Sequence, residues 1–285
     1  MSAQILDGKA IAHQIQDSLA KEVQELREKT GRVPGLHVIV VGNDPASQVY
    51  VRNKHRTCEK LGFASTVHEL PENATFNEVL QRIDELNSSP DVNGILVQLP
   101  LPGQMDAQKV MLRISPEKDV DGFNPINVGK LVAGNPLFIP CTPAGIVELI
   151  SHTGISVEGK EALVIGRSNI VGKPLSLLLL QKNATVTIAH SRTRDLPEVA
   201  SRADILVVAI GKPAFATSDF IKDGAVVIDV GINRDERGKL TGDVDFEAAR
   251  KKASWFTPVP GGVGPMTIAM LMKNTMKAFR LHNSL

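Results

Sequence analysis

A tyrosine and a lysine are the first candidates for chemistry in this sequence. Tyr50 and Lys54 are four residues apart, and Tyr50 is the only tyrosine of the 285-residue chain. On a helix this spacing puts both side chains on the same face. A phenol and an amine on one face can move protons in general acid–base catalysis. The alternative interpretation is that Lys54 is a solvated surface charge, because helical lysines are mostly exposed.

The same Tyr-x-x-x-Lys spacing occurs in short-chain dehydrogenases, in which the tyrosine transfers the proton. In that family the cofactor-binding turn precedes the pair. Here the candidate turn, residues 166–174, follows Lys54 by more than a hundred residues. The order of the motifs therefore argues against that family.

Three further polar residues are candidates for the same chemistry. Gln98 ends the apolar run that begins at Gly94, and parallel sheets bind ligands at the carboxyl ends of their strands. An uncharged glutamine there can hold a hydrogen-bonding partner without adding charge, or it can simply end the strand. Asp119 and Asp121 offer two carboxylates in one turn, although an Asp–Gly sequence is also a common chain reversal.

Residues 166–174 indicate a dinucleotide site. An apolar run at 162–165 leads into Gly166, Arg167 and Ser168, and a leucine-rich helical run follows at 175–180. A glycine-bearing turn from a strand to a helix N-terminus lets backbone N–H groups meet a pyrophosphate. The pattern departs from GxGxxG, because Ser168 replaces the second glycine and the next glycine, Gly172, comes one residue late. On this segment alone, an ordinary strand–turn–helix connection is the alternative.

The following strand favours NADP over NAD. NAD sites usually place a carboxylate on the ribose hydroxyl about 20 residues after the turn. Here the run at 185–189 is followed by basic and hydroxyl residues, with no carboxylate before Asp195. Arg167, Ser191 and Arg192 could together hold a 2′-phosphate. The alternative is a solvated basic loop.

The elements that position these residues form two blocks. Apolar β-branched runs alternate with helical patterns, which is typical of parallel strands joined by crossover helices. The predicted strands are 36–41, 65–70 and 94–99 in the first half, then 162–165, 185–189, 205–209 and 225–230 in the second. The predicted helices are 5–29, 45–61, 75–87 and 266–281. Residues 116–143 keep no period for long and are the expected hinge between the blocks.

Composition excludes several other classes. Lys and Arg total 32 against 31 Asp and Glu, so no long-range field steers the chain to nucleic acid or to a membrane. No apolar run reaches the length of a membrane span. Cys58 and Cys141 are the only cysteines, which suggests reduced thiols and a cytoplasmic protein. We expect no metal site, because Cys, His and carboxylate residues do not cluster at ligand spacing.

Several sequence blocks, taken together, carry a resemblance. The chain resembles the bifunctional methylenetetrahydrofolate dehydrogenase/cyclohydrolase family over essentially its whole length. The matching blocks are PASQVYV from Pro45 with Lys54, GILVQLPLP from Gly94, KDVDGF from Lys118, PCTPAGI from Pro140, GRSNIVGKP from Gly166 and PVPGGVGPMT from Pro258.

The resemblance implies two α/β lobes with a cleft between them, the second a Rossmann-like doubly wound parallel sheet. Residues 1–140 would form the folate-binding catalytic domain, completed by the C-terminal helix 265–285, and residues 141–264 would bind NADP. In the first domain, Tyr50 would stack on the aminobenzoyl ring, Lys54 would be the catalytic base or acid, Gln98 would tune Lys54, and Asp121 would hold the pterin. Pro260 and Gly261 would also contact the substrate. The cofactor residues would be Gly166, Arg167, Ser168, Ser191, Arg192 and Ile232.

The reaction implied is oxidation of the 5,10-methylene bridge of tetrahydrofolate with NADP, followed by hydrolysis of the methenyl product to 10-formyltetrahydrofolate. The resemblance further implies a cytoplasmic homodimer that serves one-carbon metabolism and purine biosynthesis. Two alternatives remain at this point. They are a two-lobed dehydrogenase for another small substrate and a non-enzymatic NADP-binding sensor.

Overall fold

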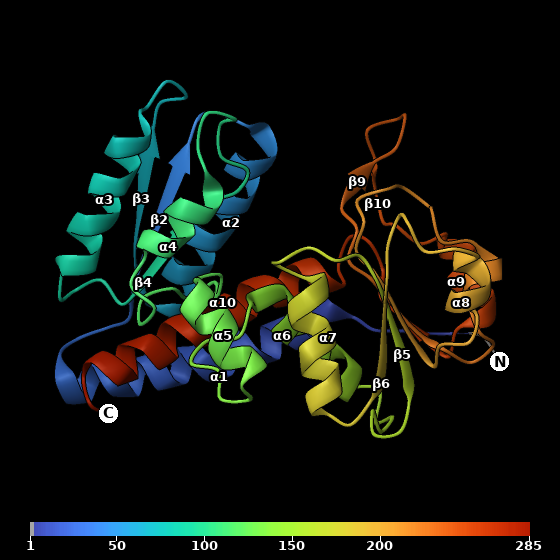
Figure 1. Ribbon diagram of the computed structural model, residues 1–285. Coiled ribbons are helices and arrows are strands. Elements are labelled where there is room, and N and C mark those ends of the chain that lie inside the picture. The colour runs from blue at the N-terminus through green and yellow to red at the C-terminus, as the bar shows by residue number, and fades with distance from the viewer. Residues whose placement is uncertain (1–2) are drawn as a thin grey trace. The chain divides into compact units, whose positions relative to one another are not determined.

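The computed structural model describes residues 3–285, which fall into two compact units. The six-stranded unit holds residues 3–13 and 142–267, and the three-stranded unit holds residues 14–141 and 268–285. Most of their elements are labelled in Figure 1. The expected boundary, which kept residues 1–140 together, is wrong at the N-terminus. Residues 3–13 belong to the six-stranded unit because β1 (Gln4–Ile5) pairs in parallel with β11 (Trp255–Phe256). Residues 1–2 of the expected domain lie outside the described part of the chain.

The six-stranded unit is built on one parallel sheet. Its strand order is β1-β11-β8-β7-β5-β6, and every adjacent pair is parallel. Parallel neighbours need crossover connections, which in this unit are mostly helices. The remaining strands are β5 (Glu161–Ile165), β6 (Thr185–Ala189), β7 (Ile205–Val208) and β8 (Val226–Asp229). The helices are α6 (Cys141–Ser151), which starts at the unit boundary, α7 (Gly172–Gln181), α8 (Leu196–Ala200), η1 (Ser218–Phe220) and α9 (Phe246–Lys252).

The inner strands of this sheet explain the apolar runs of the sequence. All four residues of β7 and all four of β8 are buried. A strand covered on both faces reads as a continuous apolar run rather than as an alternation. One face carries a core that includes Leu163, Leu206 and Phe220. Strands β9 (Asn233–Arg234) and β10 (Leu240–Thr241) form a separate antiparallel hairpin. The architecture is the Rossmann-like sheet that the sequence predicted.

The three-stranded unit has a smaller parallel sheet in the order β3-β2-β4. Helix α2 packs against β2 and β3, and α3 packs against β4 and α4. The core on the α3 side includes Ile39, Val79, Ile83 and Ile95, all fully buried. The strands are β2 (Gly35–Val41), β3 (Ala64–Leu70) and β4 (Gly94–Val97). The helices are α1 (Gly8–Thr30), α2 (Pro45–Leu61), α3 (Phe76–Ser88), α4 (Ala107–Arg113), α5 (Pro125–Val132) and α10 (Val263–His282), of which α1 and α10 begin in the six-stranded unit.

Helix α2, which carries Tyr50 and Lys54, has strong local signals at both ends. The Asp44 side chain accepts the N–H of Ser47 at 2.8 Å, and Pro45 follows at the first helical position. Both features stabilise a helix start. Gly62 ends the helix in the left-handed conformation, with φ of 79°, which glycine adopts without steric cost. The register of the Tyr50–Lys54 face is therefore fixed from both ends.

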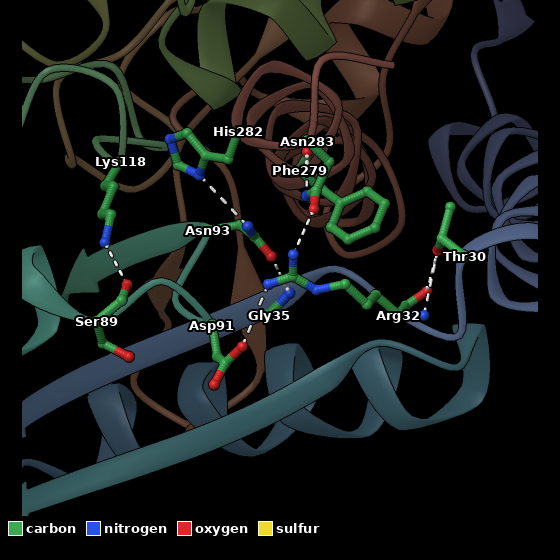
Figure 2. A network of polar contacts seen from close by, with 10 residues as sticks. All are labelled: Thr30, Arg32, Gly35, Ser89, Asp91, Asn93, Lys118, Phe279, His282 and Asn283. Atoms are coloured by element: carbon green, nitrogen blue, oxygen red, sulfur yellow. Dashed lines mark hydrogen bonds and ion pairs between the residues drawn. The ribbon is translucent and has the colours of Figure 1, made fainter.

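The last residues of α10 are fastened to the start of β2 by a polar network (Figure 2). Arg32 donates to the side-chain oxygen of Asn283 at 2.7 Å. The Asn93 oxygen accepts the N–H of Gly35 at 2.8 Å, and its nitrogen lies 3.3 Å from Nδ1 of His282. These contacts tie residues 268–285 to the three-stranded sheet.

The expected hinge at 116–143 is not irregular throughout, because it contains α5 and the first residues of α6. Asn124 caps α5 by accepting the N–H of Ile126 at 2.8 Å. Eight residues make only about two helical turns, too few to show a clear hydrophobic period. Within residues 3–285, no helix is long and apolar enough to cross a membrane. No group of three or more His, Cys, Asp or Glu side chains in the same residues is placed to hold a metal ion.

Candidate active site

Lys54 and Gln98 meet in the three-stranded unit. Lys54 is only 8% exposed, and its Nζ donates to Oε1 of Gln98 at 3.0 Å. The amide nitrogen of Gln98 donates to the carbonyl of Leu99 at 2.7 Å, which leaves its oxygen facing the amine. The backbone of Gln98 continues the sheet, because its N–H donates to Ile39 at 2.8 Å. A buried amine is thus held in one orientation at the carboxyl end of β4.

Tyr50 and Asp121 are the other two titratable candidates for the site of Lys54. Tyr50 lies one turn before Lys54 on α2 and is half-buried, and burial raises the pKa of its phenol. Burial also raises the pKa of Asp121, while the positive charge of Lys54 and the neighbouring Cys141 thiol work in the opposite direction. Lys54, Gln98 and Asp121 therefore form one electrostatically coupled group, and Tyr50 shares its helix with Lys54.

The two carboxylates of the 118–123 segment have different positions. Asp119 is 1% exposed and accepts the N–H groups of Phe123 and Asn124 and the side chain of Asn127, at 2.8 to 3.1 Å. Burial raises its pKa to about 6, although these hydrogen bonds lower it. Asp119 thus holds the segment before α5, and the charge of Asp121 links it to the Lys54 group by also raising its pKa. Lys118 likewise donates to three backbone carbonyls at the end of α3, at 2.7 to 3.0 Å (Figure 2 shows the bond to Ser89).

Sequence reasoning missed three polar groups of the three-stranded unit. The hydroxyl of Ser47 is buried and has no hydrogen-bond partner among the described residues. Ser47 lies seven residues before Lys54, so two helical turns place it on the same face; that spacing was the available signal. The Cys141 thiol donates to the carbonyl of Val120 at 3.3 Å, and the Asn274 amide donates to the same carbonyl at 2.8 Å. Nothing in the sequence links Asn274 to residue 120.

The turn between β5 and α7, the candidate pyrophosphate site, is held by close backbone contacts. Gly166 has φ of 129°, and a Cβ there would overlap the carbonyl oxygen of Ala209. A Cβ on Gly172 would overlap the carbonyl of Gly166, so the late glycine is required by the close backbone approach. The hydroxyl of Ser168 accepts the N–H groups of Val171 and Gly172 at 3.1 and 3.3 Å. Ser168 therefore closes the turn and shapes the start of α7, which is the positive end of the helix dipole.

The segments that carry Arg167, Ser191 and Arg192 begin at the ends of two paired strands, β5 and β6. Ile165 pairs with Ala189, and the N–H of Gly166 donates to Ala189 at 2.9 Å. The residues that follow each strand therefore start from neighbouring positions at one edge of the sheet. The side chains of Arg167, Ser191 and Arg192 are exposed. Neither arginine forms an ion pair within residues 3–285, so both remain available to an anion.

The other expected contacts also lie in the six-stranded unit. Ile232 follows β8 and is 49% exposed. Pro260 and Gly261 form part of the turn before α10, where the carbonyl of Gly261 accepts the N–H of Lys9 at 2.9 Å. The structure therefore groups Lys54, Gln98 and Asp121 in one unit and the cofactor candidates at one edge of the other sheet. Pro260 and Gly261 belong to a different unit from Tyr50.

Comparison with known families matches both parts of the chain. Residues 6–121 match the catalytic domain of tetrahydrofolate dehydrogenase/cyclohydrolase. Residues 140–283 match the NAD(P)-binding domain of the same enzymes. The two matches fall in the order that the sequence blocks indicated.

Individual relatives are similar over almost the whole length. The bifunctional protein FolD of Streptococcus sanguinis is 60% identical over 278 residues, which cover 98% of each chain. The crystal structure of the bifunctional enzyme FolD from Campylobacter jejuni has a TM-score of 0.96 at 49% identity, covering 99% of this chain and all of that one. The Trypanosoma brucei enzyme, solved with NADP and an inhibitor, also has a TM-score of 0.96, at 40% identity and with full coverage of both chains.

Proposed function

The chain belongs to the tetrahydrofolate dehydrogenase/cyclohydrolase family, and from this premise we propose that it catalyses both reactions of that family. The enzyme oxidises 5,10-methylenetetrahydrofolate to the 5,10-methenyl form with NADP and then hydrolyses that product to 10-formyltetrahydrofolate. The observation that carries the proposal is the buried amine of Lys54, held by Gln98 at 3.0 Å. A solvated surface lysine would have neither the burial nor the fixed partner.

Lys54 is proposed to manage the proton of the hydrolytic step. Water that attacks the methenyl carbon must lose a proton, and Lys54 in its neutral amine form can take it. Gln98 is the positioning partner, because Leu99 holds its amide nitrogen and its oxygen faces Nζ of Lys54. A neutral amide orients the amine without adding a second charge to the site.

Tyr50 and Asp121 are proposed to bind the folate. The half-buried ring of Tyr50 offers a flat apolar face to the aminobenzoyl ring. The carboxylate of Asp121 can accept hydrogen bonds from the N–H groups of the pterin. Pro260 and Gly261 are proposed as further substrate contacts, on the strength of the sequence block around them.

The pyrophosphate of NADP is proposed to bind at Gly166, Ser168 and the start of α7. Its 2′-phosphate is proposed to bind to Arg167, Ser191 and Arg192. Ile232 is proposed to contact the same cofactor. The support is the close backbone approach at Gly166 and the two unpaired arginines beside neighbouring strands. When bound, NADP accepts the hydride from the methylene carbon. The protein residues bind and orient the two reactants.

An absorbance assay tests the activity directly. Purified protein is mixed with 5,10-methylenetetrahydrofolate and either NADP or NAD, and methenyltetrahydrofolate formation is followed. We expect turnover with NADP and much less with NAD at equal concentration. In a second assay, supplied methenyltetrahydrofolate should be consumed faster than in buffer alone. Absence of both activities would reject the proposal.

We also propose that the protein is a cytoplasmic homodimer. Strand β6 is an edge of the six-stranded sheet, and Ile188 on it is 41% exposed. An exposed apolar edge strand can pair with a second copy. Light scattering should give twice the chain mass for the wild type and a monomer for Ile188→Lys. Both cysteines are free and buried, which suits a reducing compartment.

A further inference from the structure

Two buried carboxylates in the six-stranded unit have no role in the function described so far. Asp229 ends β8 and is 6% exposed, and Asp243 follows β10 and is fully buried. Both use their oxygens to hold backbone segments, and neither forms an ion pair with a basic residue of the described chain. Buried carboxylates without a cation are costly unless hydrogen bonds compensate.

Asp243 holds the loop that follows β7. Its Oδ2 accepts the N–H groups of Ile210 and Gly211 at 2.7 and 3.0 Å. Its Oδ1 accepts the N–H of Lys212 at 2.8 Å and the side-chain amide of Asn233 at 2.8 Å. Four donors thus converge on one carboxylate, which has enough lone pairs for all of them. An asparagine would present an NH2 group to two of these donors.

Asp229 in turn holds Asp243. Its Oδ1 accepts the N–H groups of Gly231 and Asp243 at 2.9 and 2.8 Å, and its Oδ2 accepts the N–H of Val244 at 2.9 Å. A Cβ on Gly231 would overlap the carboxylate of Asp243, and a Cβ on Gly242 would overlap that of Asp229. Both glycines are therefore required by the approach of the carboxylates to the backbone.

These bonds fix the position of Ile232, a proposed cofactor contact. Ile232 lies between Gly231, which Asp229 holds, and Asn233, which Asp243 holds. The loop 210–212 begins one residue after Ala209, whose carbonyl lies against Gly166 of the pyrophosphate turn. One pair of carboxylates therefore holds the backbone of the loops that follow two neighbouring strands, β7 and β8.

The order of the strands separates these loops from the 2′-phosphate site. The sheet runs β8-β7-β5-β6, and Arg167, Ser191 and Arg192 follow β5 and β6. With neighbouring strands about 4.8 Å apart, the end of β8 lies about 14 Å from the end of β6. For a dinucleotide that extends along this edge from β6 toward β8, the loops held by Asp229 and Asp243 would lie nearer the end opposite the 2′-phosphate.

We propose that Asp243, supported by Asp229, is a positioning residue for the nicotinamide half of the NADP site. The inference rests on the proposed function, because it presumes that NADP binds at this edge of the sheet. Asp243 does not touch the cofactor. It acts through the loop 210–212 and through Ile232.

Titration of two ligands tests this role. NADP carries both the adenosine 2′-phosphate half and the nicotinamide half. Adenosine 2′,5′-bisphosphate carries only the first of these, the half proposed to bind near Arg167. Asp243→Asn should weaken NADP about tenfold or more, as expected when hydrogen bonds to a charged group are lost, and should leave the bisphosphate within about twofold. Arg167→Ala should weaken both ligands. Asp235→Asn is the matched control, because this exposed aspartate also accepts two backbone N–H groups, from Arg237 and Lys239, and should change neither affinity.

The possible outcomes distinguish failure of this inference from failure of the proposed function. Equal weakening of both ligands by Asp243→Asn would mean a general loss of structure, and unchanged NADP binding would mean no role; either result overturns the inference. If Asp243→Asn shows no cooperative melting transition, Asn233→Ala decides, because it removes one bond to Asp243 and leaves the loop 210–212 held. That variant should weaken NADP about threefold or more without affecting the bisphosphate, and unchanged affinity would overturn the inference. A wild-type protein that binds neither ligand would instead reject the proposed function.

Discussion

Lys54 and Arg167 are both basic residues of the proposed site, yet their environments are opposite. Lys54 is buried and donates to one fixed acceptor, Gln98. Arg167 is exposed and has no ion pair in the described part of the chain. In the three-stranded unit the proposed function depends on an oriented side chain. In the six-stranded unit it depends largely on backbone segments that Ser168, Asp229 and Asp243 hold by hydrogen bonds.

This difference predicts different sensitivity to substitution. Lys54 is the buried, oriented amine of the proposed site, so its loss should be severe. An exposed arginine is one of several groups that hold a phosphate, so its loss should weaken one ligand without stopping the chemistry. The predictions below use this contrast, from the largest expected effect to the smallest.

Lys54→Met removes the amine and keeps the approximate length of the side chain. With supplied methenyltetrahydrofolate, hydrolysis should fall at least about a hundredfold, because a positioned base typically contributes 10²–10⁴-fold. The dehydrogenase should fall less, since hydride transfer needs mainly that the two reactants be held together. Lys60→Met, at an exposed position on the same helix, is the matched control. Hydrolysis near the wild-type rate would make Lys54 a structural residue.

Arg167→Ala should weaken NADP about tenfold or more and NAD little, because only NADP carries the 2′-phosphate. The magnitude follows from the loss of a charge-assisted hydrogen bond, about 1.5–3 kcal/mol. Dissociation constants of both cofactors should be measured by calorimetry for this variant and for Arg202→Ala, an exposed arginine of the same unit. Equal weakening of NADP and NAD would show that Arg167 does not read the 2′-phosphate.

His37→Asn should reduce the acid sensitivity of the three-stranded unit. Burial, the neighbouring His68 and Lys118 lower the pKa of His37 to about 4. Below pH 6.5 the unfolded chain binds a proton that folded His37 does not, so the stability is lost as the pH falls from about 6.5 to about 4. Because His37 is only half-buried, we expect about 1–2 kcal/mol rather than the full value of the shift. Melting temperatures at pH 7 and pH 4.5 test this.

The control for that prediction is His152→Asn, an exposed histidine of the six-stranded unit. It should leave the difference in melting temperature between the two pH values unchanged. If His37→Asn loses as much stability in acid as the wild type, the His37–His68 contact at 2.9 Å does not govern acid sensitivity.

The sequence predicted the elements that leave a continuous pattern. The strand expected at 185–189 is β6 as observed, and the helix expected at 45–61 is α2. Buried parallel strands and capped amphipathic helices can be predicted from a few neighbouring residues, because their apolar patterns are local. Gln98 was expected to act on Lys54, and the two side chains are 3.0 Å apart; the catalytic role itself remains a prediction.

The contacts that the sequence did not predict join distant segments. Strand β1 has two residues and pairs with β11, about 250 positions away, so no local period reveals it. Asp243 holds the loop 210–212 through backbone N–H groups, which every residue except proline has. The residues that donate to such a carboxylate therefore cannot be identified from their side chains in the sequence. Asp119 and Asp121 looked equivalent in sequence, because the hydrogen bonds that Asp119 accepts from Phe123, Asn124 and Asn127 are not visible in residue type.

The central claim is that the two units carry separate tasks, and one measurement tests it directly. The NADP dissociation constant is determined for Arg167→Ala both alone and combined with Lys54→Met, each against its own background. Residues without shared partners usually have additive effects within about 0.5 kcal/mol. We therefore predict that Arg167→Ala weakens NADP by the same factor in both backgrounds, within about twofold. A factor that changes more than about fivefold would contradict the separation of tasks.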